Sequence, residues 1–272
     1  MRITVLGARG SIPVSGTEKS EFGQATSCYM VEAGKQLIFL DAGSGITDMP
    51  DVFQTESRPV SVFLSHVHLD HIQGLPFFPM LKKKEQNINI YLPAHLERAQ
   101  ESASLAEMLE RVFSPPIWPC TLMDYPAHVH MAAPVFPMQL GEEGDETVIE
   151  VMDGSHPNGS FIYKLRHGGK TLVYATDFEH TEGKLEQLAG FAEDTDLLLY
   201  DGQYTDEEYE KHKGYGHSTP WVGVRLMQAC GAKRLLLIHH DPAHDDNMLR
   251  AAEREIGLSE VSFARRMQEI EL

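Results

Sequence analysis

Cysteine, basic residues and long apolar runs are all scarce in this chain of 272 residues. The three cysteines, Cys28, Cys120 and Cys230, are odd in number and form no CxxC pair, which argues against a disulfide framework and suits a reducing compartment. No stretch approaches the ~18 apolar residues of a membrane span, and the first apolar run is too short for a signal peptide. We therefore expect a cytoplasmic protein that does not enter a membrane.

Basic residues are fewer than acidic residues in this chain. Lys and Arg number 23 against 40 Asp and Glu, so the formal net charge is −17. Long-range repulsion at this charge disfavours nucleic-acid polymers and anionic membranes as partners. A small phosphate substrate is not excluded, because the charge of a bound metal can dominate inside one pocket.

The order of apolar runs predicts an α/β fold in which helices cover sheets. No linker or repeat divides the chain, so we expect one domain over residues 1–272. Six prolines between 114 and 137 exclude a single helix there and favour loops and edge strands over a cap or a dimer contact. The predicted strands are 2–6, 28–33, 36–40, 60–64, 87–92, 147–152, 160–166, 171–175, 196–200 and 234–238, and the predicted helices are 94–112, 218–229 and 246–255.

The strongest chemical signal is the run SHVHLDH at residues 65–71, directly after the predicted strand 60–64. His66 and His68 are two positions apart, so both point to one face of an extended chain. Asp70 and His71 follow where the chain turns toward the next segment. Imidazole nitrogen and carboxylate oxygen together suit Zn²⁺, Mn²⁺ or Fe²⁺, so the run predicts a metal site rather than a polar surface turn.

One such run cannot hold two metals, so further donors must come from elsewhere. His156, Asp177 and His239 each lie at or just beyond the end of a later predicted strand. A single histidine at a strand end is more often a hydrogen-bonded structural group. Because α/β folds gather ligands at one edge of a sheet, we expect these three to meet residues 66–71.

The HxHxDH run, followed in order by His156, Asp177 and His239, resembles the metallo-β-lactamase-fold hydrolases, and most closely the phosphodiesterase branch that includes tRNase Z and cyclic phosphodiesterases. The resemblance covers nearly the whole chain and implies a four-layer αββα sandwich. It also implies two divalent ions, with zinc or manganese foremost and iron as a further candidate. The implied ligands are His66, His68 and His156 for one ion and Asp70, His71 and His239 for the other, with Asp177 bridging.

The expected reaction is hydrolysis of a phosphodiester by attack of a metal-bridging hydroxide, because two divalent ions lower the pKa of a bound water toward ~7. Asp70 is predicted to be catalytic as well as a ligand. The sequence Gly216-His217-Ser218-Thr219 resembles the motif with the catalytic histidine of the branch. A histidine suits general acid catalysis near neutral pH, so His217 is the predicted proton donor. Asp41 is either a turn carboxylate or a group that orients a ligand imidazole.

A small phosphodiester, foremost a cyclic nucleotide, is the expected substrate. The first alternative is a tRNA 3′-end endonuclease, but such relatives carry a long basic arm where only 21 positions separate His156 from Asp177. The others are a thioester or lactone hydrolase and a non-catalytic metal-binding module, although di-iron relatives usually place Glu where His68 stands. A homodimer is expected from the frequency of symmetric dimers. His240 is predicted to be structural and to point away from His239, and His128 and His130 to lie on the surface of an edge strand.

Overall fold

The computed structural model describes residues 1–55, 57–93 and 104–272. Within these ranges the strands form two seven-stranded mixed sheets. The first has the order β14-β1-β2-β3-β4-β5-β6, with β1 (Arg2–Gly7), β2 (Cys28–Ala33), β3 (Gln36–Leu40), β4 (Val60–Phe63), β5 (Asn87–Tyr91), β6 (His128–Ala132) and β14 (Glu269–Glu271). The second has the order β13-β12-β11-β10-β9-β8-β7, with β7 (Met138–Leu140), β8 (Thr147–Asp153), β9 (Phe161–His167), β10 (Lys170–Ala175), β11 (Leu197–Asp201), β12 (Leu235–Ile238) and β13 (Val261–Phe263).

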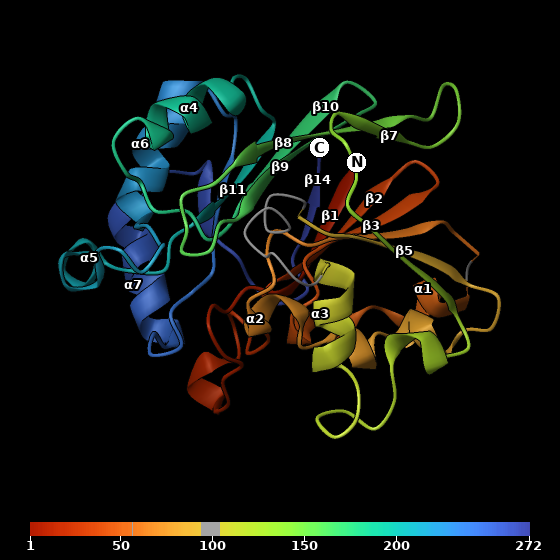
Figure 1. Ribbon diagram of the computed structural model, residues 1–272. Coiled ribbons are helices and arrows are strands. Elements are labelled where there is room, and N and C mark those ends of the chain that lie inside the picture. The colour runs from red at the N-terminus through yellow and green to blue at the C-terminus, as the bar shows by residue number, and fades with distance from the viewer. Residues whose placement is uncertain (56, 94–103) are drawn as a thin grey trace.

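Helices cover the outer face of each sheet (Figure 1). None of the described helices is long and apolar enough to cross a membrane. Those beside the first sheet are α1 (Asp51–Thr55), α2 (Leu69–Ile72) and α3 (Leu105–Val112), and those beside the second are α4 (Lys184–Phe191), α5 (Asp206–His212), α6 (Pro220–Cys230) and α7 (Asp246–Ile256).

The apolar runs of the central strands are buried on both faces. In β3, Leu37 and Phe39 belong to the core between the first sheet and its helices, whereas Ile38 and Leu40 belong to the core between the two sheets. Successive residues of a strand point to opposite faces, so a strand covered on both sides needs a continuous apolar run. The sequence LLLYD of β11 follows the same rule: Leu199 packs between the sheets and Tyr200 against the helices.

The predicted strands and the two later helices are confirmed to within two residues. The helix predicted over 218–229 begins at Pro220, because Thr219 caps it by accepting a hydrogen bond from the Val222 N–H. Of the helix predicted over 94–112, residues 105–112 form α3, and 94–103 lie outside the described residues. The sequence interpretation missed α4, α5, β13 and β14, and β6 is the edge strand expected in the proline-rich segment.

Parallel pairing places the ends of several strands at one edge of each sheet. In the first sheet β3 pairs parallel to β4, and in the second β10, β11 and β12 pair parallel in turn. Polar residues stand at these carboxyl ends: Asp41 after β3, His66 after β4, Asp177 after β10, Asp201 at the end of β11 and His239 after β12.

Candidate metal centre

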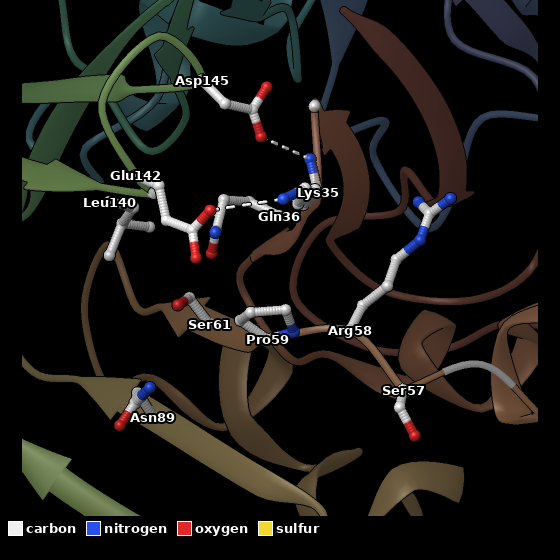
Figure 2. A pocket seen from close by; sticks show the side chains of 12 residues that line it. Lys35, Gln36, Ser57, Arg58, Pro59, Ser61, Asn89, Leu140, Glu142 and Asp145 are labelled. Atoms are coloured by element: carbon white, nitrogen blue, oxygen red, sulfur yellow. Dashed lines mark hydrogen bonds and ion pairs between the residues drawn. The ribbon is translucent and has the colours of Figure 1, made fainter.

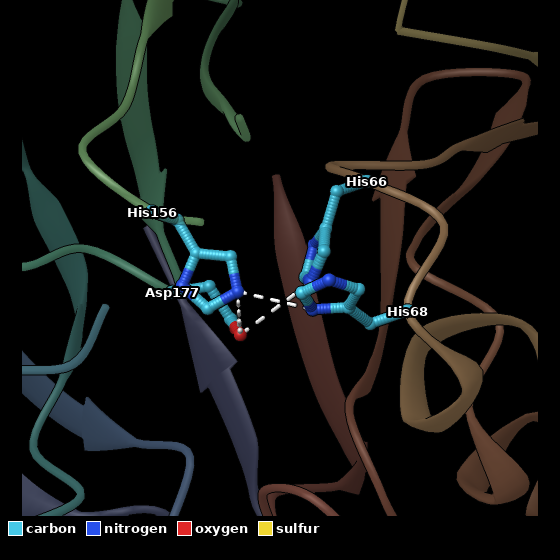
Figure 3. A group of neighbouring side chains, drawn as sticks. All are labelled: His66, His68, His156 and Asp177. Carbon is cyan, nitrogen blue, oxygen red and sulfur yellow. Dashed lines mark hydrogen bonds and ion pairs between the residues drawn. The ribbon is translucent and has the colours of Figure 1, made fainter. Parts of the chain in front are cut away.

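All seven predicted ligands meet where the carboxyl ends of the two sets of strands face each other. The ligand atoms of the first group lie within 4.8 Å of one another, and so do those of the second. In Figure 3, His66 and His68 approach from one side and His156 and Asp177 from the other. The first group is His66, His68, His156 and Asp177, and the second is Asp70, His71 and His239.

Asp177 stands between the two groups. Its Oδ1 lies 3.1 Å from Nε2 of His71 and 3.2 Å from Nε2 of His239. Its Oδ2 lies 3.5 Å from Nε2 of His66 and 3.6 Å from Nε2 of His156. Each oxygen thus faces a different group, which is the arrangement of a carboxylate that bridges two ions.

The backbone turns sharply at three of the strand ends. Asp41, Asp177 and His239 have positive φ angles of 61°, 47° and 61°. Residues other than glycine rarely adopt this conformation, and it costs of order 1–3 kcal/mol where it occurs. The surrounding packing therefore holds these three side chains in place against a local backbone preference.

The residues present fit divalent metal ions. Nε2 of His66, His71 and His239 is buried and has no hydrogen-bond partner. An unsatisfied buried polar atom is costly, and a cation at these nitrogens would satisfy all three. Histidine nitrogen with carboxylate oxygen is a donor set for zinc, manganese or iron.

Protein acceptors orient the other nitrogen of these rings. A carboxylate or carbonyl oxygen can only accept a hydrogen bond, so a ring nitrogen beside one carries a proton, and in the neutral ring the opposite nitrogen then has a lone pair to offer a metal. His68 differs from the other four rings, because its Nδ1 faces the first group and lies 3.0 Å from Nε2 of His156. The Nδ1 contacts are His71 to Asp41 Oδ2 at 2.7 Å, His239 to Gln203 Oε1 at 2.8 Å, His156 to the Gly216 carbonyl at 3.0 Å and His66 to Ser65 Oγ at 3.0 Å.

Asp41 is the most connected of these acceptors. It is fully buried and accepts hydrogen bonds from the Ser65 N–H at 2.6 Å, the Ser65 hydroxyl at 2.8 Å and the Tyr174 hydroxyl at 2.6 Å, in addition to His71. Because Ser65 Oγ donates to Asp41, it accepts from His66. The predicted contact of Asp41 with a ligand imidazole is confirmed, and the same carboxylate reaches His66 through Ser65.

The two groups have opposite electrostatic character. Burial lowers the pKa values of His66, His68 and His156, because the charged imidazolium loses its hydration. Burial acts in the same direction on His71 and His239, but the nearby carboxylates outweigh it. They raise the pKa of His71 well above its usual value and that of His239 to about 9. The second group therefore lies in the more negative electrostatic environment of the two.

The loop after β1 closes the second group. The Ser11 N–H donates to Asp70 Oδ2 at 2.8 Å, and this oxygen lies 3.3 Å from Nε2 of His71 and 3.4 Å from that of His239. A Cβ on Gly10 would lie 2.5 Å from the His239 ring. Glycine is required at this position because the backbone passes directly over a site residue.

His217 lies beside the two groups. Its ring centroid is 4.8 Å from that of His239 and 5.1 Å from that of His156. Nδ1 of His217 lies 2.8 Å from Oδ2 of Asp201, a fully buried carboxylate that also accepts a hydrogen bond from the Gln203 N–H. The sequence interpretation missed Asp201 and Gln203, although Asp201 directly follows the predicted strand 196–200, much as other site residues follow predicted strands.

A separate cavity of about 540 Å³ lies at the opposite ends of β3 and β4 (Figure 2). Its lining includes residues at the starts of these strands, such as Gln36 and Ser61, whereas the predicted metal ligands lie beyond the ends of their strands. Lys35 pairs with Glu142 at 3.3 Å and donates its backbone N–H to Asp145, so these charges satisfy one another. No histidine lines this cavity among the described residues, which leaves the metal centre as the candidate site.

Three histidines outside the candidate site lie where the sequence predicts. His240 is buried, its Nε2 lies 2.9 Å from the Ala264 carbonyl, and its ring packs beside Phe22 and Phe263. His128 and His130 are exposed on the edge strand β6. These three residues take no part in the centre.

Comparison with known proteins agrees with this geometry. The family described as "Beta-lactamase superfamily domain" matches residues 37–240. "Probable metallo-hydrolase YhfI" of Bacillus subtilis is 24% identical over 97% of both chains, and its crystal structure superposes with a TM-score of 0.72 at 21% identity, covering 100% of this chain and 98% of that one. "Ribonuclease Z" of Halorubrum lacusprofundi is 24% identical over 94% of this chain and 92% of its own. A structure titled as a new diphosphatase from the PhnP family has a TM-score of 0.68 at 18% identity, covering 100% of this chain and 97% of that one.

Proposed function

This chain belongs to the β-lactamase superfamily and has its metallo-β-lactamase sandwich fold, and on that premise we propose that it is a metal-dependent hydrolase of phosphodiester bonds in a small substrate, foremost a cyclic nucleotide. The observation that carries the proposal is Asp177, whose two oxygens face two separate groups of ligand atoms. Such a pair of sites suits displacement at phosphorus, in which both the attacking and the leaving oxygen need stabilisation.

The protein residues supply geometry and the metals supply charge. When bound, two divalent ions polarise the phosphate and lower the pKa of a water molecule. Asp177 sets the separation of the two groups, and Asp41 fixes the rings of His66 and His71. These fixed orientations place the donor atoms before substrate arrives, so little reorganisation is needed during the reaction.

His217 is the proposed proton donor to the leaving oxygen. Its Nδ1 is committed to Asp201, so Nε2 is the nitrogen that exchanges a proton with substrate. The buried carboxylate fixes the orientation and tautomer of the ring, as an acid does for histidine in hydrolytic triads. Asp201 is in this account a positioning residue.

The chain between His156 and Asp177 supports a small substrate. The strands β9 and β10 occupy it, so a long arm that grips an RNA has no room there. The net charge of −17 also opposes a polyanion. Processing of tRNA 3′ ends is the second candidate, favoured by the similarity to proteins named ribonuclease Z.

A substrate panel with defined metals tests the proposal. The protein is loaded with Zn²⁺ or Mn²⁺ and offered cyclic mononucleotides, cyclic dinucleotides, a chromogenic phosphodiester and a precursor tRNA. We expect turnover of the chromogenic ester and of at least one cyclic nucleotide, with the tRNA intact. Cleavage of the tRNA alone would favour the second candidate, and a fully metallated protein inert toward every ester would contradict both.

A further inference from the structure

We propose that Glu179 is a positioning residue that fixes the loop 213–217, so that this one loop both orients His156 and carries His217. The role of His217 rests on the proposed function, whereas the role toward His156 needs only that the centre binds metal. Glu179 lies two residues after Asp177 and is 7% exposed.

The carboxylate of Glu179 holds the loop at two backbone positions and also contacts α5. Oε1 accepts hydrogen bonds from the Gly214 N–H at 2.7 Å and from the Tyr209 hydroxyl at 3.2 Å, and Oε2 accepts one from the Gly216 N–H at 3.2 Å. The backbone N–H of Glu179 donates to the Ser155 carbonyl at 2.7 Å. One residue thus joins the end of the second sheet, the residue before His156 and the loop.

Gly216 passes this restraint to the metal ligand. Its N–H is bonded to Glu179, and its carbonyl oxygen lies 3.0 Å from Nδ1 of His156. Gly216 has φ 95°, and a Cβ there would lie 2.1 Å from Nδ1 of His156. Only glycine permits this approach, and a loop that contains two glycines needs a tether to keep one conformation.

The next residue along the loop is His217, bonded to Asp201. The Glu179 carboxylate therefore fixes two things through the loop: the tautomer of His156 and the position of His217 relative to the metal site. His71 and His239 of the second group bond instead to Asp41 and Gln203. Loss of the Glu179 carboxylate should therefore weaken one metal position selectively.

Competition titration of the metal-free full chain with Zn²⁺ against a chromophoric chelator tests this selectivity. We expect Glu179→Ala to weaken one of two ions about 10–100-fold, the usual effect of losing a hydrogen-bond partner of a ligand, and to leave the other unchanged. Glu179→Gln keeps the acceptor oxygen but turns an amide NH₂ toward one backbone N–H, so its loss should be smaller. Glu182→Ala, on an exposed glutamate of the same turn, is the matched control and should bind both ions as the parent does.

Unchanged affinity for both ions in Glu179→Ala, or equal weakening of both, would overturn the proposal. If circular dichroism shows that Glu179→Ala is unfolded, Glu179→Gln decides by the same criterion.

Leaving-group dependence gives a second readout, for His217. In Glu179→Gln with both sites saturated, turnover of an alkyl phosphodiester should fall further than turnover of a nitrophenyl ester, because the poorer leaving group needs the proton donor more. Equal losses on both esters would refute the link to His217. If the parent hydrolyses neither ester, the proposed function fails, and the metal titration still decides the role of Glu179.

Discussion

The two sheets contribute to the candidate metal centre in different ways. The first sheet delivers His66, His68, Asp70 and His71 from one short segment after β4. The second sheet delivers its ligands singly, from separate strand ends that only the order β12-β11-β10-β9-β8 brings together. One half of the centre is thus encoded locally, and the other half exists only in the folded sheet.

The hydrogen-bond acceptors that orient the imidazole rings also differ between the two halves. In the first half one buried carboxylate, Asp41, serves two imidazoles, directly and through Ser65. In the second half, His239 is oriented by Gln203 and His156 by the Gly216 carbonyl. A single change in the first half should therefore disturb both metal positions, whereas one in the second half should disturb one.

Breaking the connection between the halves should have the largest effect. Among the seven predicted ligands, only Asp177 has one oxygen facing each group. The variant Asp177→Ala removes both oxygens. We expect turnover of a chromogenic phosphodiester to fall by about 10³-fold or more, since the stabilisation supplied by metals amounts to several kcal/mol. Metal content by atomic emission should fall below two ions per chain.

Asp153→Ala is a suitable control, because this residue is exposed near the end of β8 and is not one of the ligands. If Asp177→Ala held two ions tightly and kept near-normal turnover, Asp177 would not be the residue that connects the two groups of ligands.

The sequence predicted most of the fold and which side chains gather at the candidate site. Runs such as Leu235–Ile238 are apolar throughout because both strand faces are buried, so strand positions were visible. The locally encoded half was visible because HxHxDH is contiguous. The ligands His156, Asp177 and His239 were visible only as residues at strand ends, in an order that matched the resemblance.

Residues that act through other residues were harder to predict. Asp201 and Glu179 are ordinary carboxylates in the sequence, and their roles come from bonds to His217 and Gly216 that span 16 and 37 positions. The short elements α4 and β14 carry too few residues for a periodic pattern to stand out. Strand ends predict which residues can gather, but only the folded contacts show which of them support the ligands.

The next effect concerns His217 and Asp201, which lie in the second half but are not among the seven predicted ligands. His217→Ala should lower turnover of an alkyl phosphodiester about 10²–10⁴-fold, the usual contribution of a general acid, while both ions stay bound. Asp201→Asn should have a smaller effect of the same kind, because the ring remains but loses its charged partner. Parallel measurement of metal content separates the roles: a loss of metal equal to the loss of activity in His217→Ala would identify His217 as a ligand instead.

Weakening the support of the first half should have a more modest effect. Asp41→Asn leaves a side chain of the same size that accepts fewer hydrogen bonds, so the rings of His66 and His71 are held less firmly. We expect both zinc affinities to fall about 10–100-fold and the free energy of unfolding to drop by about 1–3 kcal/mol from the unpaired donors. Gln203→Leu, which touches only the support of His239 among the ligands, should weaken one ion alone. If Asp41→Asn weakened one ion and Gln203→Leu weakened both, Asp41 would not be the residue that supports both metal positions.

The smallest effect distinguishes two consecutive residues at the end of β12. Carboxylates raise the pKa of His239 to about 9, whereas burial and the nearby Arg9 lower the pKa of His240 to about 3. A depressed histidine pKa means that the unfolded chain binds a proton that the folded chain refuses, so the contribution of His240 to stability is lost as the pH falls from about 6.5 toward 3. The loss at pH 5 is on the order of 2 kcal/mol.

His240→Gln offers an amide that donates to the Ala264 carbonyl as Nε2 of His240 does, but it does not titrate. Urea unfolding of this variant between pH 7 and pH 5 should therefore show a shallower loss of stability than the parent shows. His128→Gln, at a histidine whose side chain is 54% exposed, should follow the parent curve. Parallel curves for His240→Gln and the parent would mean that His240 is protonated in the folded protein. In that case His239 and His240 would both carry a proton in the folded protein, and the predicted difference between them would be wrong.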